Sequence, residues 1–122
     1  MYLVSPIVYL ESKDFTNSGT LKHFKNKTCV IMIQANYCGH CTSAKPLFQK
    51  FADKHKDNKD VLCLTIQGDG DDAKDTEKML AIVSKLKPGF QGFPDCLLFK
   101  KGKYVEKEIK GRNEASLEEF IK

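Results

Sequence analysis

The sequence has no tryptophan, no apolar run long enough to cross a bilayer, and no strong excess of charge of one sign. The missing run excludes a transmembrane helix, which needs about 20 apolar residues. The net charge is only +4 and the basic residues are scattered among acidic ones, so nucleic-acid binding has little support. Repeats, linkers and low-complexity segments are also missing. The 122 residues, 41% of them hydrophobic, therefore predict one globular domain over residues 1–122.

Targeting signals are missing from both ends of the sequence. The first ten residues are apolar, but they have no basic leading segment and no small-residue cleavage site, as a secretory signal would. Residues 119–122 do not form a retention signal for the endoplasmic reticulum. The five cysteines are odd in number and lack the spacing of a disulfide framework. We therefore expect a cytoplasmic protein whose structural thiols stay reduced.

The hydrophobic pattern predicts alternating strands and helices. Strands are expected at residues 3–10, 29–33, 61–66, 96–99 and 104–109, and helices at 14–25, 38–55, from the acidic loop 68–72 to residue 86, and at 116–121. Pro6 favours an edge position for the first strand, and Phe15, Leu21 and Phe24 are the expected inward side of the first helix. The order β-α-β-α-β-α-β-β-α predicts an α/β fold with a mixed sheet and helices on both faces.

The tetrapeptide Cys38-Gly39-His40-Cys41 is the clearest chemical motif. It follows an apolar strand and begins a helix-patterned segment, so both cysteines lie on one side of the first turn, close enough to form a disulfide. Free N–H groups and the helix dipole there favour a thiolate, which makes Cys38 the candidate nucleophile and Cys41 the resolving thiol. Zinc binding is the alternative, but zinc usually takes four ligands and the sequence has no second C-x-x-C.

Other polar residues give weaker signals. A charged His40 would stabilise the Cys38 thiolate and make the disulfide a better oxidant, whereas the alternative is an exposed spacer. His23 and His55 are expected to be solvated. The acidic run at 69–72 superficially suggests calcium, but it lacks the EF-hand spacing and a helix-capping loop is expected. Cys29 and Cys63 fall in core strands and are expected to act as small buried hydrophobic residues. Cys96 lies two residues after Pro94, and the sequence leaves open which way its side chain faces.

Together these motifs resemble the thioredoxin superfamily over nearly the whole chain. The Cys-Gly-His-Cys sequence is similar to the active site of protein disulfide isomerase domains. Pro46 matches the kinked active-site helix, Gly102 the hairpin turn, and Gly111-Arg112 the closing glycine region. The resemblance implies a thioredoxin fold that needs no metal, flavin or nucleotide cofactor. The chain is also similar to small thioredoxin-like proteins of large DNA viruses, so a viral origin is one hypothesis.

The resemblance also implies a substrate-docking surface. Gly92-Phe93-Pro94 before a strand resembles the family's cis-proline loop, in which Pro94 faces the active-site loop. The backbone of Phe93 would then be exposed for β-like pairing with an extended substrate. Tyr37, Gly92, Phe93 and Gly111 would form a small apolar docking surface, with core packing as the alternative for Phe93.

Several positions depart from the family pattern. Met32 stands six residues before the first active-site cysteine, where the family usually buries an acid. Cys63 is the nearest match to the lysine that many thioredoxins place opposite that acid. Asp95 replaces a common threonine after Pro94, and Tyr37 replaces the usual tryptophan. The stretch between residues 67 and 86 is longer than a minimal thioredoxin needs.

The function implied is a thiol–disulfide oxidoreductase that reduces, or reversibly oxidises and isomerises, protein disulfides through a Cys38/Cys41 cycle. Expected partners are protein disulfides or dithiols, with a thioredoxin reductase or glutathione as electron donor. The chain is expected to act as a monomer, without nucleic acid or membrane. The alternative is a thioredoxin-fold adaptor with incidental redox activity, which the missing acid favours. The net direction stays open, because similar domains act as reductants or oxidants.

Overall fold

The computed structural model describes residues 2–122 of the chain. Its elements in chain order are β1 (Val8–Tyr9), the 3₁₀-helix η1 (Ser12–Asp14), β2 (Thr28–Gln34), α1 (Gly39–Lys54), β3 (Val61–Gln67), α2 (Ala73–Leu86), β4 (Asp95–Lys100), β5 (Lys103–Val105) and α3 (Glu114–Phe120). Within residues 2–122, no helix combines the length and apolar character needed to cross a membrane.

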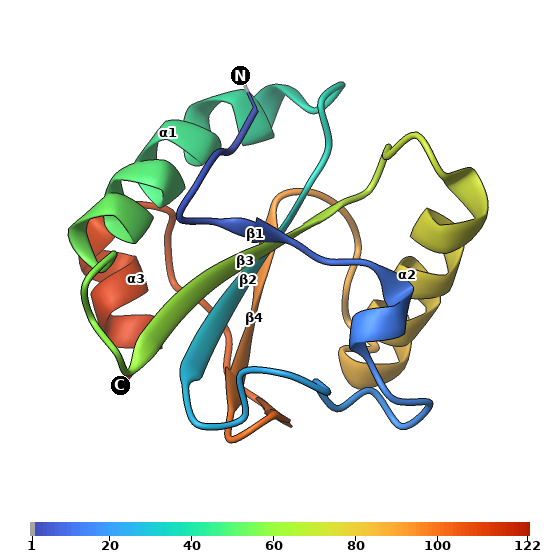
Figure 1. Cartoon of the computed structure of the whole chain (residues 1–122). Helices are drawn as coiled ribbons and strands as arrows, with labels where there is room; N and C mark the ends of the chain where they lie inside the picture. The colour runs from blue at the N-terminus through green and yellow to red at the C-terminus, as the bar shows by residue number, and fades with distance from the viewer. Residues whose placement is uncertain (1) are drawn as a thin grey trace.

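The strands form one mixed sheet in the order β1-β3-β2-β4-β5. β3 runs parallel to β1 and β2, whereas β4 is antiparallel to both β2 and β5. Helices α1 and α3 cover one face of the sheet and α2 covers the other (Figure 1). The central strands β2 and β3 are apolar almost throughout because both of their faces are covered. The predicted α/β fold with a mixed sheet is therefore confirmed.

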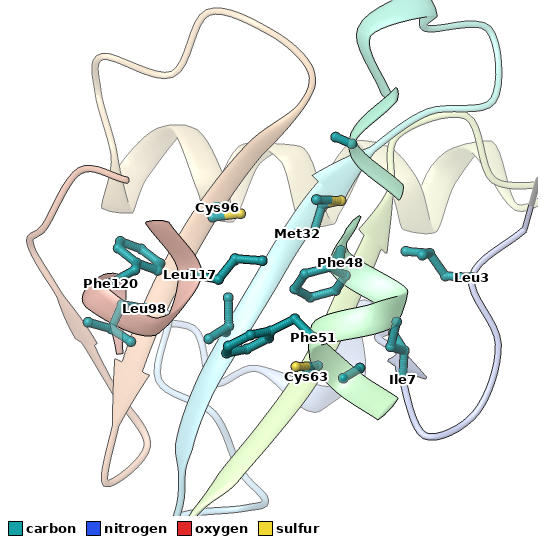
Figure 2. Packing of buried hydrophobic residues seen from close by; sticks show 13 residues of the cluster. Leu3, Ile7, Met32, Phe48, Phe51, Cys63, Cys96, Leu98, Leu117 and Phe120 are labelled. Atoms are coloured by element: carbon teal, nitrogen blue, oxygen red, sulfur yellow. The ribbon is translucent and has the colours of Figure 1, made fainter. Parts of the chain in front are cut away.

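Two hydrophobic cores lie on opposite faces of the sheet, because successive side chains of a strand alternate between faces. Val30 and Met32 of β2 belong to the core under α1 and α3, whereas Ile31 belongs to the core under α2. In the first core, Phe48 and Phe51 of α1 are fully buried against the sheet. Figure 2 shows Met32 and Phe48 close together in this core.

The first strand is much shorter than predicted. The extended segment is limited to Val8–Tyr9, because the chain turns at residues 5–6 before it, and Ile7 N–H donates to the Val4 carbonyl at 3.0 Å across the turn. Pro6 follows a cis peptide bond and has no N–H to contribute to a sheet. β1 does lie at the edge of the sheet, as the sequence predicts.

The predicted helix over residues 14–25 is wrong. Helical structure in this region is confined to Ser12–Asp14, after which the chain folds back and Phe15 pairs with Leu21 as an isolated antiparallel bridge. Gly19 adopts a φ of 86°, which lies outside the helical region. Phe15 and Leu21 are nevertheless buried, and Phe24 is half-buried against the same core, so the inward side was predicted correctly although the backbone was not.

The other elements lie within a few residues of their predicted positions, except the last strand. β5 ends at Val105, and residues 106–109, predicted to continue it, are irregular. The buried side chain of Lys87 holds this segment instead, because its Nζ lies 2.9 Å from the exposed carboxylate of Glu108 and 2.8 Å from Asp95. Lys87 therefore ties the chain after β5 to the start of β4.

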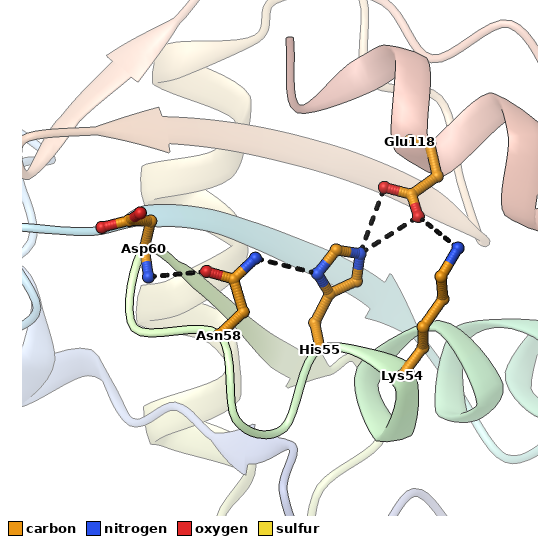
Figure 3. A network of polar contacts seen from close by, with 5 residues as sticks. All are labelled: Lys54, His55, Asn58, Asp60 and Glu118. Atoms are coloured by element: carbon orange, nitrogen blue, oxygen red, sulfur yellow. Dashed lines mark hydrogen bonds and ion pairs between the residues drawn. The ribbon is translucent and has the colours of Figure 1, made fainter.

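A polar network joins α1 to α3 around Glu118 (Figure 3). Lys54 Nζ and His55 Nε2 lie 2.9 and 3.1 Å from the Glu118 carboxylate, and Asn58 contacts the other ring nitrogen of His55 at 3.1 Å. The expectation that His55 is solvated is wrong, because its side chain is only 13% exposed and its ring packs on Phe51 with centroids 4.5 Å apart.

This network predicts an acid-sensitive contribution to stability. The hydrogen bond from Lys54, opposed by burial and aided by His55, lowers the pKa of the Glu118 carboxyl below its ordinary 4.5. A carboxyl whose pKa is lower in the folded state stabilises the fold above its unfolded pKa, and this contribution disappears as the pH falls through the folded pKa. Glu118→Gln should lower the free energy of unfolding by about 0.5 kcal/mol near neutral pH, and this difference should vanish in acid.

Urea unfolding at a series of pH values measures the Glu118 effect. The matched control is Glu119→Gln on the same helix, which removes an exposed pair with Lys122. The control should leave the pH dependence of stability unchanged. If both variants reduce the pH dependence of the free energy of unfolding equally, the Glu118 network does not make the acid-sensitive contribution to stability.

Candidate active site

Cys38 stands at the junction between β2 and α1. It is the N-cap residue of α1, with extended backbone angles, and the helix begins at the next residue, Gly39. Its Sγ accepts a hydrogen bond from the backbone N–H of Cys41 at 3.1 Å. A sulfur in this position receives an N–H that has no partner within the helix, and negative charge on that sulfur is stabilised there.

Cys41 lies one turn into the helix and is completely buried, whereas Cys38 is partly exposed. Burial, followed by its interaction with Cys38, raises the pKa of the Cys41 thiol to about 11. The thiol of Cys41 is therefore mostly protonated near neutral pH. The difference in exposure agrees with the predicted order, in which Cys38 meets an incoming group first and Cys41 is shielded.

The loop before β4 faces Cys38. The peptide bond between Phe93 and Pro94 is cis, as predicted. The Cys38 thiol donates to the Phe93 carbonyl at 3.5 Å, although 55 residues separate the two in the sequence. The structure thus places the backbone of Phe93 beside the exposed cysteine, where an extended peptide bound to this loop would have its disulfide close to Cys38.

Aromatic side chains surround this loop. Tyr37, which directly precedes Cys38, is 72% exposed and meets the Phe93 ring edge-on at 6.1 Å between centroids. Phe90 packs against the other side of Phe93 at 5.8 Å. Phe93 is half-buried, so it takes part both in packing and in the surface. We call Tyr37, Phe90 and Phe93 the aromatic surface.

Gly68, at the end of β3, makes room for the aromatic surface. A Cβ atom on Gly68 would lie 2.2 Å from Cζ of Phe93, which is far inside van der Waals contact. The Phe93 ring therefore lies directly over the backbone of Gly68. This position of the ring requires glycine at residue 68.

The remaining predicted site residues lie at varying distances from Cys38. Gly92 is exposed next to Phe93, and His40 is exposed on the first turn of α1. Gly111 lines a cavity of about 240 Å³ together with Pro94 and Met32.

Met32 is 2% exposed and lies opposite Cys96 of β4 and Thr65 of β3 in the sheet register. The sequence indicated that this position, under α1, lacks the acid usual in the family. The Met32 thioether can neither donate nor accept a proton, so Met32 cannot replace that acid. Cys96, whose orientation the sequence left open, belongs to the same core, and burial raises the pKa of its thiol to about 12.

Asp69 holds the segment that leads into Cys38. Its two carboxylate oxygens accept the backbone N–H of Asn36 at 3.0 and 2.9 Å. Burial opposes ionisation, but hydrogen bonds from Asn36, Gln67 and Tyr37 lower the pKa of Asp69 below its ordinary 3.8. The helix-capping loop expected over residues 69–72 is confirmed at Asp72, whose side chain accepts the N–H of Asp75 at the start of α2.

The thioredoxin family model matches residues 6–122. The chain belongs to the thioredoxin family. It is 40% identical over 133 aligned residues to thioredoxin-like protein 453L of Invertebrate iridescent virus 6, which covers 98% of this chain and 95% of that protein. It is also 35% identical over 102 residues to thioredoxin of Gallus gallus, covering 84% of each chain.

Longer proteins with thioredoxin-family domains are also similar. Protein disulfide-isomerase A5 of Bos taurus is 29% identical over 116 residues, which covers 95% of this chain but 20% of that protein. The zinc-bound form of human ERp44 superposes with a TM-score of 0.65 at 18% identity, covering 94% of this chain and 30% of that chain. The second similarity shows the fold alone. The relatives together place this chain among thiol–disulfide oxidoreductases.

One departure from the thioredoxin-family pattern has a structural explanation. Asp95, which stands where threonine is common, accepts the backbone N–H of Cys96 at 2.8 Å and pairs with the buried Lys87. The carboxylate and the ammonium therefore fix the chain directly after Pro94. Cys63, at the position nearest the family's lysine, is buried, and burial raises the pKa of its thiol to about 12.

Sequence reasoning missed three residues of the site in this thioredoxin-family chain. They are Gly68, Asp69 as a support of the active-site loop, and Phe90. Phe90 carried a signal, because it lies between the helix-ending Pro88-Gly89 and Phe93. The others depend on contacts between distant segments, which spacing along the chain does not reveal.

Proposed function

We propose that this chain catalyses thiol–disulfide exchange with protein substrates, using Cys38 as nucleophile and Cys41 as resolving thiol. The observation that supports this proposal most strongly is the geometry of the two cysteines. Cys38 is partly exposed at the helix N-cap, and its sulfur accepts the N–H of the fully buried Cys41 at 3.1 Å. Both features favour attack by Cys38 on an external disulfide and protect the second thiol until it is needed.

The proposed cycle has two exchange steps. The Cys38 thiolate attacks a substrate disulfide, a bond forms from Cys38 to one substrate sulfur, and the other substrate sulfur leaves as a thiolate. Cys41 then loses its proton and attacks Cys38, and the second substrate sulfur leaves with the electron pair. The substrate disulfide is reduced and a Cys38–Cys41 disulfide forms. The same steps in reverse oxidise or reshuffle protein thiols.

Neighbouring residues would support this cycle. A charged His40 would favour the Cys38 thiolate and make the disulfide more oxidising. The Phe93 backbone and the aromatic surface would hold an extended peptide beside Cys38, while Gly92 leaves open space there. Gly111 would act in the cavity that it lines together with Pro94. The proposed electron donor is a thioredoxin reductase or glutathione, and the proposed setting is cytoplasmic.

A second candidate is a protein-binding adaptor with incidental redox activity. Two observations favour it, namely the exposed Tyr37 beside Phe93 and the apolar Met32 in the core under α1. An insulin-reduction assay separates the candidates. The oxidoreductase reduces insulin with turnover and loses this activity in Cys38→Ser, whereas an adaptor binds its partners equally well with or without Cys38.

The packing of Phe93 on Gly68 predicts a change in substrate affinity. Gly68→Ala would push the Phe93 ring away, because its Cβ would lie 2.2 Å from Cζ of that ring. We expect the KM for a protein disulfide substrate to rise about tenfold, equivalent to about 1.4 kcal/mol of lost binding, with kcat nearly unchanged. The matched control is Gly89→Ala in the neighbouring loop, where a Cβ has open space. A folded Gly68→Ala protein with an unchanged KM would exclude the aromatic surface from docking.

A further inference from the structure

Lys45 is a buried lysine next to the proposed redox pair. It lies on α1 four residues after Cys41 and is only 3% exposed. Residues four apart on a helix share one face, so both side chains lie on the side of α1 that faces the sheet. Fully buried lysines are uncommon because an ammonium loses its hydration there. A lysine kept at this position needs an explanation.

The surroundings of Lys45 are polar where the rest of this core is apolar. Its Nζ donates to Oδ1 of Asn36 at 2.9 Å, just before Cys38 in the chain. Gln34 follows Met32 by two residues on β2 and Thr65 follows Cys63 by two on β3, so both face α1 as well. The ends of these two central strands therefore form a polar floor beneath the first turns of α1.

Hydrogen bonds within this floor leave one buried acceptor open. The Thr65 hydroxyl donates to the Met32 carbonyl at 2.8 Å, so its oxygen accepts from Nε2 of Gln34 at 3.2 Å. Among the described residues, no donor satisfies Oε1 of Gln34, although the side chain is buried. The polar groups beneath the first turns of α1, next to Cys41, thus include the Lys45 ammonium and the neutral Oε1 acceptor of Gln34. Met32, Gln34 and Thr65 contribute no carboxylate.

We propose that the Lys45 ammonium stabilises the Cys41 thiolate while Cys41 attacks the mixed disulfide. Lys45 would thereby assist the step that an acid at residue 32 would otherwise assist. The proposal rests on the proposed function. The reaction balances as follows. Cys41 releases its proton to water and bonds to Cys38, the bond from Cys38 to the substrate sulfur breaks, and that sulfur leaves with the electron pair and takes up a proton. Lys45 acts through Cys41 and is a positioning residue.

Electrostatics agree with this geometry. Burial is the main reason why the pKa of Cys41 is raised to about 11, and the positive charge of Lys45 acts in the opposite direction. The groups that face this region are Cys38 from the N-cap, Asp69 from the loop after β3, Asp95 and Cys96 from β4, and Lys110 and Arg112 from the segment before α3. The Asp95 carboxylate is paired with Lys87. Asp69 is held by the Asn36 backbone, and Cys96 is protonated near neutral pH.

Single-turnover kinetics of a pre-formed mixed disulfide test the proposal. Lys45→Met removes the charge and keeps the length of the side chain. We expect the decay of the mixed disulfide to slow about tenfold at a given pH, as for a rise of one unit in the pKa of Cys41. The same rate should return at a pH about one unit higher. Lys45→Arg should restore most of the wild-type rate, and attack by Cys38 on a fresh substrate disulfide should change less than about twofold.

Lys50→Met is the matched control, because Lys50 is an exposed lysine on the same helix. Lys45→Met is expected to fold, since replacing a buried charge by an apolar side chain of similar size is often neutral for stability. If it does not, Lys45→Gln is the second neutral variant, with an amide that can still donate to Asn36. An unchanged pH profile in either folded neutral variant overturns the role of Lys45. Failure of the wild-type protein to form or resolve mixed disulfides overturns the proposed function instead.

Discussion

Cys41→Ser is expected to trap mixed disulfides with protein substrates, whereas Cys38→Ser is expected to trap almost none. Cys38 is partly exposed at the helix N-cap and Cys41 is fully buried, so an incoming disulfide reaches Cys38 first. Without the resolving thiol, the first exchange has no intramolecular second step. Disulfide turnover should fall about a thousandfold or more in either variant, because nucleophile and resolving thiol act as one unit.

Non-reducing gels and mass spectrometry of the trapped adducts measure this outcome. The control is Cys63→Ser, which changes a buried thiol in β3 outside the proposed redox pair. It should form no more adducts than the wild-type protein. Adducts that accumulate in Cys38→Ser and not in Cys41→Ser would reverse the roles of the two cysteines.

Met32→Asp should both destabilise the fold and accelerate the second exchange step. Met32 is 2% exposed in the core under α1, so a carboxylate there loses its hydration. We expect the free energy of unfolding to fall by about 3 kcal/mol. A carboxylate beside Cys41 could accept its proton, and general-base assistance is expected to speed mixed-disulfide decay by at least about tenfold.

The conservative variant Met32→Leu separates the two effects of this substitution. It keeps the volume of the side chain and should cost less than about 1.5 kcal/mol, with no change in decay rate. Stopped-flow measurement of mixed-disulfide decay is the readout, with urea unfolding for stability. If Met32→Asp folds and the decay rate matches that of Met32→Leu, the missing acid does not limit this protein.

Local patterns in the sequence were sufficient to predict the central part of the fold. The continuous apolar run of β2 and the C-x-x-C at the start of α1 identified the junction where the cysteines lie. The loop containing Phe93-Pro94 was also predicted, because the motif itself specifies its conformation. In these regions the short-range pattern and the final contacts agree.

The features that the sequence could not predict depend on contacts between distant segments of the chain. Residues 15–25 fold back because Leu21 N–H donates to the Gly102 carbonyl at 2.8 Å, a partner in the distant turn between β4 and β5. The burial of Lys45 was not predicted either, because a lysine on a helix is normally expected to reach solvent. Its burial depends on Asn36, and the position of the Phe93 ring depends on Gly68.

The redox equilibrium of Cys38 and Cys41 in glutathione buffers tests the central claim most directly. Quantifying the Cys38–Cys41 disulfide by mass spectrometry across a series of buffers gives its midpoint potential. We predict one two-electron transition confined to these two cysteines, with a midpoint between about −270 and −180 mV. If no Cys38–Cys41 disulfide forms across this range, or if oxidation occurs instead at Cys29, Cys63 or Cys96, the assignment of this chain as a Cys38/Cys41 oxidoreductase is contradicted.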